Sequence, residues 1–562
     1  MNQRRKAGDI LPVLMALTFL ALFFYYPMVT ILKHAFVTDT GQITARYIID
    51  AVASKYNQQI LIFTIKQALL STVITLCLGL PGAYLLTKYQ FPGKSVIKAL
   101  STVPFVMPSI IVILGFIIFF GNNGIINVAL MRLFNLTEPP IRFLYSMTGI
   151  MLAHAFFNFP IVIRIVGAAW ERIDPGYEEM AASLGASNIA TLRRVTLPLL
   201  LPGIIASAAL TFVFCFSSFA IVLVLGGARY ATIEVGIYTL TKIMLKFDKA
   251  SSLAIIQALF SLTFMYLYIK TLDIYHAVGA ERMTRPIEPK RLAWRNMGWV
   301  EASLLVAYVI LILIVIFGPM LSVVYSSFQY MSGNKILFGL KNYLQIFSTA
   351  YDPILGANPL RSILNSLGFA IATVLIALPL ALILAYITVQ KRFKGKRLLD
   401  AVFMLPLGVS AVTLALGYAR AFNSPPLEFT GTALAIILAH SILAYPLAMR
   451  AIAAVWLKLD RRQVETAQSL GASRIQAFWR VELPLLRPGI IVGAVFAFAI
   501  SIGEVTTTYM LYRPEIATMP ISIFRFISSY NFYTASAMGV ILMAVCALAF
   551  FVIEKLKIKT WW

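Results

Sequence analysis

The chain has 562 residues, of which 60% are hydrophobic and only 12% are charged. Soluble domains are usually about 45–50% apolar and about 25% charged, so this composition excludes a soluble globular enzyme, a disordered chain and a disulfide-stabilised scaffold. The formal net charge of +24 would suggest nucleic acid in a soluble protein. The apolar composition, arranged in long runs, instead predicts a polytopic α-helical membrane protein, and the charge is then explained by basic loops on one side of the membrane.

Long apolar segments recur along the chain, and a membrane-spanning helix needs about 20 predominantly apolar residues. The sequence predicts twelve spans, at residues 10–32, 65–87, 99–120, 147–169, 201–226, 251–270, 300–326, 362–389, 399–420, 431–453, 488–511 and 534–553. The first apolar run is too long for a typical signal-peptide core, so we expect an uncleaved span there.

The basic residues predict how these spans are oriented. With the N-terminus in the cytoplasm, loops on the cytoplasmic side hold 29 Lys and Arg residues, and loops on the opposite side hold 14. Cytoplasmic loops of membrane proteins are enriched in these residues. We therefore expect both termini to be cytoplasmic.

One segment of the sequence occurs twice. Residues 177–205 read YEEMAASLGASNIATLRRVTLPLLLPGII, and residues 463–491 read QVETAQSLGASRIQAFWRVELPLLRPGII. The offset of 286 residues also aligns His154 with His440 and Trp170 with Trp456. A constant offset between two sets of six spans indicates a parallel repeat. We predict a first half at 1–270, a cytoplasmic linker at 271–298 and a second half at 299–562.

The repeated segment lies in the predicted loops 171–200 and 457–487, between the fourth and fifth spans of each half. In the first copy we expect a short helix near 179–184, a turn at Gly185 and a second helix at 188–195 that ends at Leu197-Pro198. A single such loop could be an interfacial anchor. Two nearly identical copies indicate that both loops contact the same kind of partner.

The repeated segment resembles the EAA loop of ABC-importer permeases, in which Glu-Ala-Ala precedes a Gly and, nine residues later, Ile-x-Leu-Pro. Matching residues are Glu179, Ala181, Gly185, Leu197 and Pro198 in the first copy, and Glu465, Ala467, Gly471, Leu483 and Pro484 in the second. The departures are Met180 and Thr466 at an Ala position, and Val195 and Val481 for Ile. The chain thus resembles a fused two-half permease. The resemblance implies an all-α membrane fold of the type I importer kind, with about twelve transmembrane helices in two parallel six-helix repeats.

The resemblance also implies partners and a location. In such importers each EAA loop docks on an ATP-binding subunit, so we expect two copies of that subunit on the cytoplasmic side and an extracytoplasmic solute-binding protein. We expect a multi-pass protein in the inner or plasma membrane of a prokaryote, in contact with lipid and not with nucleic acid. The sequence has no Gly-x4-Gly-Lys-Ser/Thr phosphate loop. We therefore expect no catalytic residue, metal or cofactor in this chain, with ATP and Mg bound by the partner subunits.

Polar residues within the predicted spans are candidates for the translocation pathway. Glu504 lies in the eleventh span, and the repeat places Ser218 at the equivalent position. An ionisable group in a membrane is a functional hypothesis by default. The fifth span of each half lines the pathway in this family, so the candidates are Glu504, Ser217, Ser218 and Thr506. Alternatively, Glu504 forms an ion pair with a cation such as Arg164 or Arg450.

His154 and His440 occupy equivalent positions in the fourth and tenth spans. They are pathway candidates as a pair facing a pore. The favoured alternative is that each is a packed histidine with hydrogen bonds between helices.

The solute is the least determined property. Segments such as residues 152–160 and 214–219 resemble thiamine permeases most closely, and ferric-iron and phosphonate-type permeases share parts of the pattern. We rank thiamine first and ferric iron second. A secondary transporter of the major facilitator type would also have twelve spans in two parallel halves, but it would not need the duplicated loop.

Overall fold

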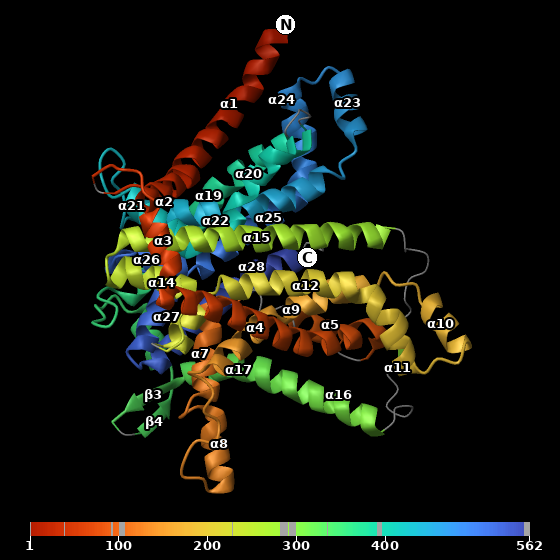
Figure 1. The fold of residues 1–562 in the computed structure, drawn as a ribbon, viewed down its shortest axis with the longest axis vertical. Coiled ribbons are helices and arrows are strands. Elements are labelled where there is room, and N and C mark those ends of the chain that lie inside the picture. Colours follow the sequence, from red (N-terminus) through yellow and green to blue (C-terminus); the bar gives the residue numbers. More distant parts are fainter. Residues whose placement is uncertain are drawn as a thin grey trace. The chain divides into compact units, whose positions relative to one another are not determined.

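A computed structural model describes residues 2–38, 40–91, 94–100, 107–227, 229–280, 290–291, 299–333, 335–390 and 396–555 (Figure 1). Most of the predicted linker 271–298 and part of the basic run at 391–397 lie outside the described residues. Within the described residues, eleven helices are long and apolar enough to cross a membrane, or up to twelve if one bent pair forms a single span. The expected all-α membrane fold is confirmed.

The first half of the chain is a series of helices with one two-residue strand. Its elements are α1 Asn2–Leu20, η1 Ala21–Tyr25, α2 Tyr26–Phe36, α3 Arg46–Ala53, α4 Lys55–Lys88, β1 Tyr89–Gln90, α5 Lys94–Leu100, α7 Ser109–Phe120, α8 Ile125–Phe134, α9 Met147–Trp170, α10 Gly176–Ser183, α11 Asn188–Thr191, η2 Leu192–Thr196, α12 Leu197–Phe216, α13 Ala220–Gly226, α14 Ile233–Tyr238, η3 Thr239–Ile243 and α15 Phe247–Ala280.

The second half repeats this order and adds a small hairpin. Its elements are β2 Lys290–Arg291, α16 Trp299–Ile312, η5 Leu313–Phe317, α17 Gly318–Ser327, β3 Gln329–Ser332, β4 Lys335–Phe338, α18 Lys341–Phe347, α19 Pro359–Gln390, α20 Lys396–Gly408, α21 Ala411–Ala421, α22 Ala433–Trp456, α23 Arg461–Ser469, α24 Arg474–Ala477, η6 Phe478–Glu482, α25 Leu483–Gly503, α26 Thr506–Leu511, η7 Pro514–Ile516, α27 Met519–Ser528 and α28 Phe532–Lys555. Strands β3 and β4 pair antiparallel, with Gln329 opposite Phe338.

The chain forms two compact units that differ from the sequence halves. One unit holds residues 1–51, 237–258 and 328–561, and the other holds 52–236 and 259–327. In the former, Tyr418 donates a hydrogen bond of 2.8 Å from α21 to the carbonyl of Phe23, in the first span. In the latter, Tyr308 donates one of 2.7 Å from α16 to the carbonyl of Leu78 in α4. The first span of each sequence half therefore packs in the unit that holds most of the other half.

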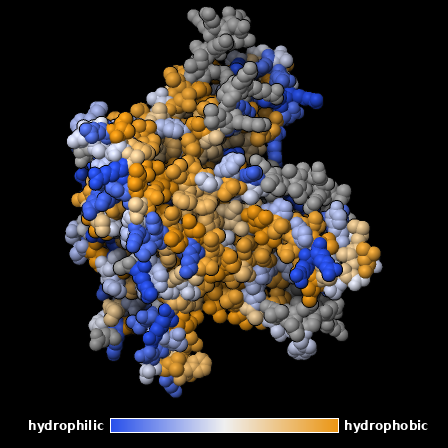
Figure 2. All heavy atoms as spheres, in the orientation of Figure 1, coloured by the Kyte–Doolittle hydropathy of each residue, from blue (hydrophilic) through white to orange (hydrophobic). Residues whose placement is uncertain are grey.

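Each unit is built around three packed helices, α4, α9 and α12 in one and α19, α22 and α25 in the other. Small residues allow close approach: a Cβ added at Gly79 of α4 would lie 2.6 Å from Val162 Cβ of α9. One added at Gly493 of α25 would lie 3.3 Å from Ala448 Cβ of α22. In membranes, small residues at helix interfaces strengthen van der Waals packing. Much of the surface visible in Figure 2 is hydrophobic, and hydrophilic residues gather over α23.

Three predicted spans need correction. The expected ninth span, 399–420, is broken into α20 and α21, which meet at an angle of 97°. Ser410 caps α21 there, since its hydroxyl accepts from the Thr413 amide at 3.1 Å. The expected spans 201–226 and 488–511 are also interrupted, because α12 ends at Phe216 and α25 ends at Gly503. Hydropathy reports only how apolar a segment is, so it predicted straight helices through these breaks. Residues 101–106 of the expected third span lie outside the described residues.

Candidate functional site

The first repeated loop folds as two short helices joined by a glycine turn. Asp174 stabilises the start of the first helix, α10, because its carboxylate accepts a hydrogen bond from the Gly176 amide at 2.8 Å. Helix α10 ends in a Schellman-type turn, in which the Gly185 and Ala186 amides donate to carbonyls of α10 at 2.9 and 3.0 Å. Ser187 then caps α11 by accepting from the Ala190 amide at 3.3 Å. The predicted helix–turn–helix is present in this loop.

The second loop repeats this geometry. The Asp460 side chain accepts from the Arg462 amide at 3.0 Å at the start of α23. The Gly471 and Ala472 amides each donate at 3.0 Å to carbonyls of α23. At the start of α24, the Ser473 hydroxyl accepts from the Gln476 backbone amide, and the Gln476 side-chain oxygen accepts from the Ser473 backbone amide, which completes a capping box.

The two turn glycines have a backbone conformation that other residues rarely adopt. Gly185 has φ +83° and Gly471 has φ +92°. No atom lies within 4 Å of a Cβ built at either position, so the space around them is open. The backbone angle, and not crowding, therefore requires glycine in both turns.

The predicted end of the second helix at Leu197-Pro198 is wrong. Helix α11 runs through the π-helical turn η2 directly into α12, and Pro198 stands in the first turn of α12. The Leu197 amide bonds to the Leu192 carbonyl, five residues back. This π-type bonding accommodates a proline, which lacks an amide, without a break. The same turn, η6, precedes Pro484 in α25.

The predicted docking residues lie on the two loops and at the start of the helix that follows each. On α10 and α23, the glutamates Glu179 and Glu465 are exposed and the alanines Ala181 and Ala467 are half-buried. The Leu-Pro pairs are the first two residues of the helices that follow, α12 (Leu197 and Pro198) and α25 (Leu483 and Pro484). Large apolar side chains beside the turns are strongly exposed: Leu184 at 88%, Ile189 at 78%, Leu470 at 84% and Ile475 at 69%. Each loop thus presents a glutamate and an apolar patch that its own unit does not cover.

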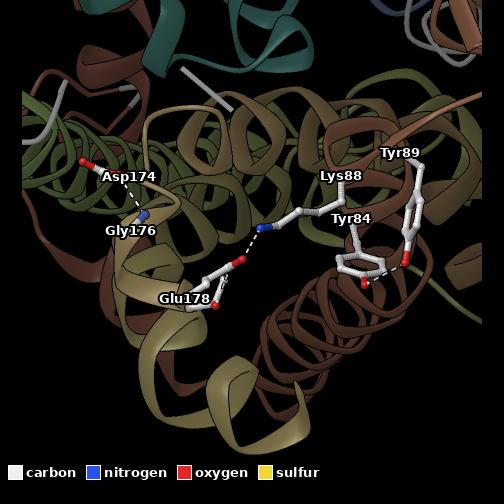
Figure 3. A network of polar contacts seen from close by, with 7 residues as sticks. Tyr84, Lys88, Tyr89, Asp174, Gly176 and Glu178 are labelled. Atoms are coloured by element: carbon white, nitrogen blue, oxygen red, sulfur yellow. Dashed lines mark hydrogen bonds and ion pairs between the residues drawn. The ribbon is translucent and has the colours of Figure 1, made fainter. Parts of the chain in front are cut away.

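Each loop is also tied to the second span of its own half. In the first half, Lys88 at the end of α4 forms an ion pair with Glu178 of α10 (Figure 3). In the second half, the guanidinium carbon of Arg474 in α24 lies 5.8 Å from the ring centre of Tyr386 in α19. Sequence reasoning missed these residues. The available signal was the departure between the otherwise similar copies, since Val464 stands where the first copy has Glu178.

The predicted pathway residues Ser217, Ser218, Glu504 and Thr506 all lie at helix breaks and are half-buried. Ser217 and Ser218 separate α12 from α13. The Glu504 carboxylate accepts hydrogen bonds from the amides of Thr506 and Thr507 at 2.7 and 2.9 Å and so caps α26. None of the three ion pairs found among the described residues involves Glu504. Glu504 is thus a half-buried residue whose carboxylate has a capping role.

The two equivalent histidines are buried and hydrogen-bonded within their own units. His154 Nδ1 lies 3.1 Å from the Ser71 hydroxyl of α4, and its Nε2 has no hydrogen-bond partner among the described residues. His440 Nδ1 lies 2.8 Å from the Ser501 hydroxyl, and its Nε2 lies 2.9 Å from the Thr508 hydroxyl. These contacts are of the kind that the packed-histidine interpretation requires.

The contacts predict different costs for removing the two histidines. Because His440 makes two interhelical hydrogen bonds and His154 makes one, and each is worth about 0.6 kcal/mol in a membrane protein, we expect His440→Ala to be the more destabilising. The measurement is thermal unfolding of the purified protein in detergent. An equal or larger loss for His154→Ala would contradict this assignment of contacts.

Comparisons with known proteins relate the chain to transport permeases. The family described as "Binding-protein-dependent transport system inner membrane component" matches residues 75–273 and 354–557. The thiamine transport system permease protein of Brucella abortus is 26% identical over 492 residues, which cover 86% of this chain and 85% of that protein. The corresponding Escherichia coli protein is 27% identical, with 88% of each chain covered.

Two further matches differ in the named solute. The ferric transport system permease protein of Actinobacillus pleuropneumoniae is 26% identical over 96% of this chain and 77% of its own length. A solved bacterial ABC transporter involved in the import of the acidic polysaccharide alginate is 20% identical, with a TM-score of 0.38, over 47% of this chain and 96% of the matched chain.

Proposed function

The chain belongs to the family of binding-protein-dependent transport system inner membrane components, and we propose that its two repeated loops dock on two ATP-binding subunits that drive import. It is the permease subunit of an ABC importer. The observation that carries the docking proposal is the recurrence, in both loops, of one geometry: an exposed glutamate, a left-handed glycine and uncovered apolar side chains. Outside a membrane, exposed apolar patches are typical of interaction sites, and both loops lie outside the predicted spans.

The chemistry of the loops indicates how the ATP-binding subunits are recognised. The apolar side chains at the glycine turns fit into a cleft, and Glu179 and Glu465 pair with basic groups at its rim. Burial of apolar surface supplies most of the affinity, and the charges set orientation. The proposal requires the loops to lie in the cytoplasm, which is the side that the basic-residue asymmetry predicts. A binding protein delivers the solute from the opposite face.

We propose thiamine as the solute. Relatives named for thiamine transport match with 85% to 88% of their own length covered, against 77% for the ferric permease. Thiamine is a cation, and the half-buried residue Glu504, which takes part in none of the ion pairs found among the described residues, suits passage of positive charge. Ser217 and Ser218 in one unit, and Thr506 in the other, are further candidates for the pathway because each carries a hydroxyl group. Ferric iron is the second candidate, supported by the ferric permease that matches 96% of this chain.

Reconstitution tests this function. The permease would be co-expressed with its ATP-binding subunit and binding protein, purified as a complex and placed in lipid vesicles. We expect two ATP-binding subunits per permease and ATP-dependent uptake of labelled thiamine that excess ferric citrate does not inhibit. Uptake of labelled iron without uptake of thiamine would show that the solute is ferric iron and not thiamine. Failure of any ATP-binding subunit to co-purify would refute the docking proposal.

A further inference from the structure

We propose that Lys88 and Glu178 are positioning residues that clamp the first docking loop to helix α4, so that movement of the loop is transmitted to that span. This inference rests on the proposed function, because it assigns the loop an ATP-binding partner. It adds that the two loops are fastened to their own halves by different chemistry. The ion pair and the residues around it are shown in Figure 3.

The Glu178 carboxylate joins three elements of the same unit. One of its oxygens accepts from the Lys88 ammonium at the end of the 34-residue helix α4. The other accepts from the Thr196 hydroxyl of η2 at 2.9 Å. Thr196 is 1% exposed. The carboxylate therefore connects α10 both to the end of a membrane span and to the turn that leads into α12.

The clamp is better shielded than the other ion pairs among the described residues. The side chains of Lys88 and Glu178 are 20% and 27% exposed, whereas those of Arg46 and Asp50 are 82% and 62% exposed. Exposed ion pairs contribute little, and removing one partner from a shielded pair leaves a poorly solvated charge. The position of Lys88 and Glu178 therefore makes their pairing consequential.

The neighbouring glutamate does not share this role. Consecutive residues of an α-helix point about 100° apart. Glu178 is accordingly turned towards α4 and half-buried, while Glu179 is exposed on the side that the unit leaves uncovered. The two neighbouring carboxylates of α10 therefore have different roles. Glu178 holds the helix to its own unit, and Glu179 is accessible to a partner.

The second loop is fastened by different contacts. Val464 and Glu482 occupy the positions of Glu178 and Thr196. There, Arg474 donates a hydrogen bond to the Tyr386 hydroxyl and lies beside its ring. Arg474 belongs to α24, and Tyr386 to α19, the counterpart of α4. Charge reversal at Lys88 or Glu178 should therefore weaken the attachment of the first loop to its half and leave that of the second loop unchanged.

A clamp of this kind determines how efficiently ATP hydrolysis is converted into transport. If α10 can shift without α4, the ATP-binding subunits close but the span does not follow. Docking is then retained while coupling is lost. A residue that only stabilised the fold would lower docking, hydrolysis and transport together.

The decisive experiment is a charge swap in the full complex. We expect Lys88→Glu and Glu178→Lys, each alone, to keep ATP-subunit co-purification but to raise the ATP hydrolysed per solute imported by at least about fivefold, as expected for breaking a shielded pair. The double variant should return this ratio to within about twofold of wild type. The matched control is the exposed pair, Arg46→Glu with Asp50→Arg, for which we expect no change.

Two further measurements keep the test independent of folding failure and of the solute. Lys88→Met and Glu178→Gln remove the charge without reversing it and should give smaller increases in the same ratio. Hydrogen exchange of the α10 amides should be faster in each single variant and normal in the swap. If the single variants hydrolysed as much ATP per imported solute as wild type, and their α10 amides exchanged at the wild-type rate, the clamp proposal would be wrong. Loss of ATP-subunit binding by wild type would instead overturn the proposed function.

Discussion

Substituting both turn glycines by valine, Gly185→Val with Gly471→Val, is expected to abolish co-purification of the ATP-binding subunits and, with it, solute uptake. Both residues have φ between +80° and +95°, and a β-branched side chain strongly disfavours that region. Left-handed backbone costs an ordinary L-residue about 1–2 kcal/mol. The loop would relieve this strain by unfolding its turn, which would displace the exposed glutamate and apolar side chains from their docking arrangement.

The control for this prediction is Gly185→Asn with Gly471→Asn. Asparagine adopts the left-handed conformation more readily than other non-glycine residues. Apart from the chain neighbours, no heavy atom lies within 4 Å of a Cβ at either position, so the Cβ of asparagine has open space. We expect the Asn pair to retain ATP-subunit binding and most uptake. Normal docking by the Val pair would refute the assignment of the loops. Equal loss in both pairs would show that a side chain itself, and not the backbone angle, is excluded by the partner.

The second large effect is expected at Glu504, where two substitutions separate capping from charge. Glu504→Gln keeps an oxygen that can accept from the amides of Thr506 and Thr507, so thermal stability in detergent should stay close to wild type. It removes the negative charge, so uptake of cationic thiamine should fall about tenfold, which corresponds to about 1.4 kcal/mol of lost stabilisation along the pathway. The measurement is the initial rate of labelled thiamine uptake into vesicles.

Glu504→Ala serves as the comparison, because it removes both the charge and the cap. Loss of a capping side chain costs about 0.5–2 kcal/mol, so this variant should be less stable than wild type as well as slow in uptake. If Glu504→Gln transported thiamine at the wild-type rate, the carboxylate would be a helix cap alone and would have no part in the pathway. If Glu504→Gln were as unstable as the Ala variant, the amide would not replace the cap.

Local chemistry explains why much of this protein could be predicted from its sequence. In a membrane the backbone polar groups must be satisfied within the protein, which leaves helices or closed barrels. Long apolar runs, and not short alternating segments, then indicate the all-α class. The turn at Gly185 follows from a glycine between two helix-forming segments. The duplicated segment, aligned at a constant offset, identifies the loops. These features depend on residues adjacent in the chain.

The tertiary structure decided what depends on residues far apart or on the path of the backbone. Lys88 and Glu178 are separated by 90 positions, and no local pattern pairs them. The 97° bend between α20 and α21 and the break at Glu504 lie in apolar segments that hydropathy treats as continuous. The first spans pack in the unit that holds most of the other half, although the repeat suggests two self-contained halves. The sequence therefore determined which segments enter the membrane and which loops protrude, and only long-range packing decided how those loops are held.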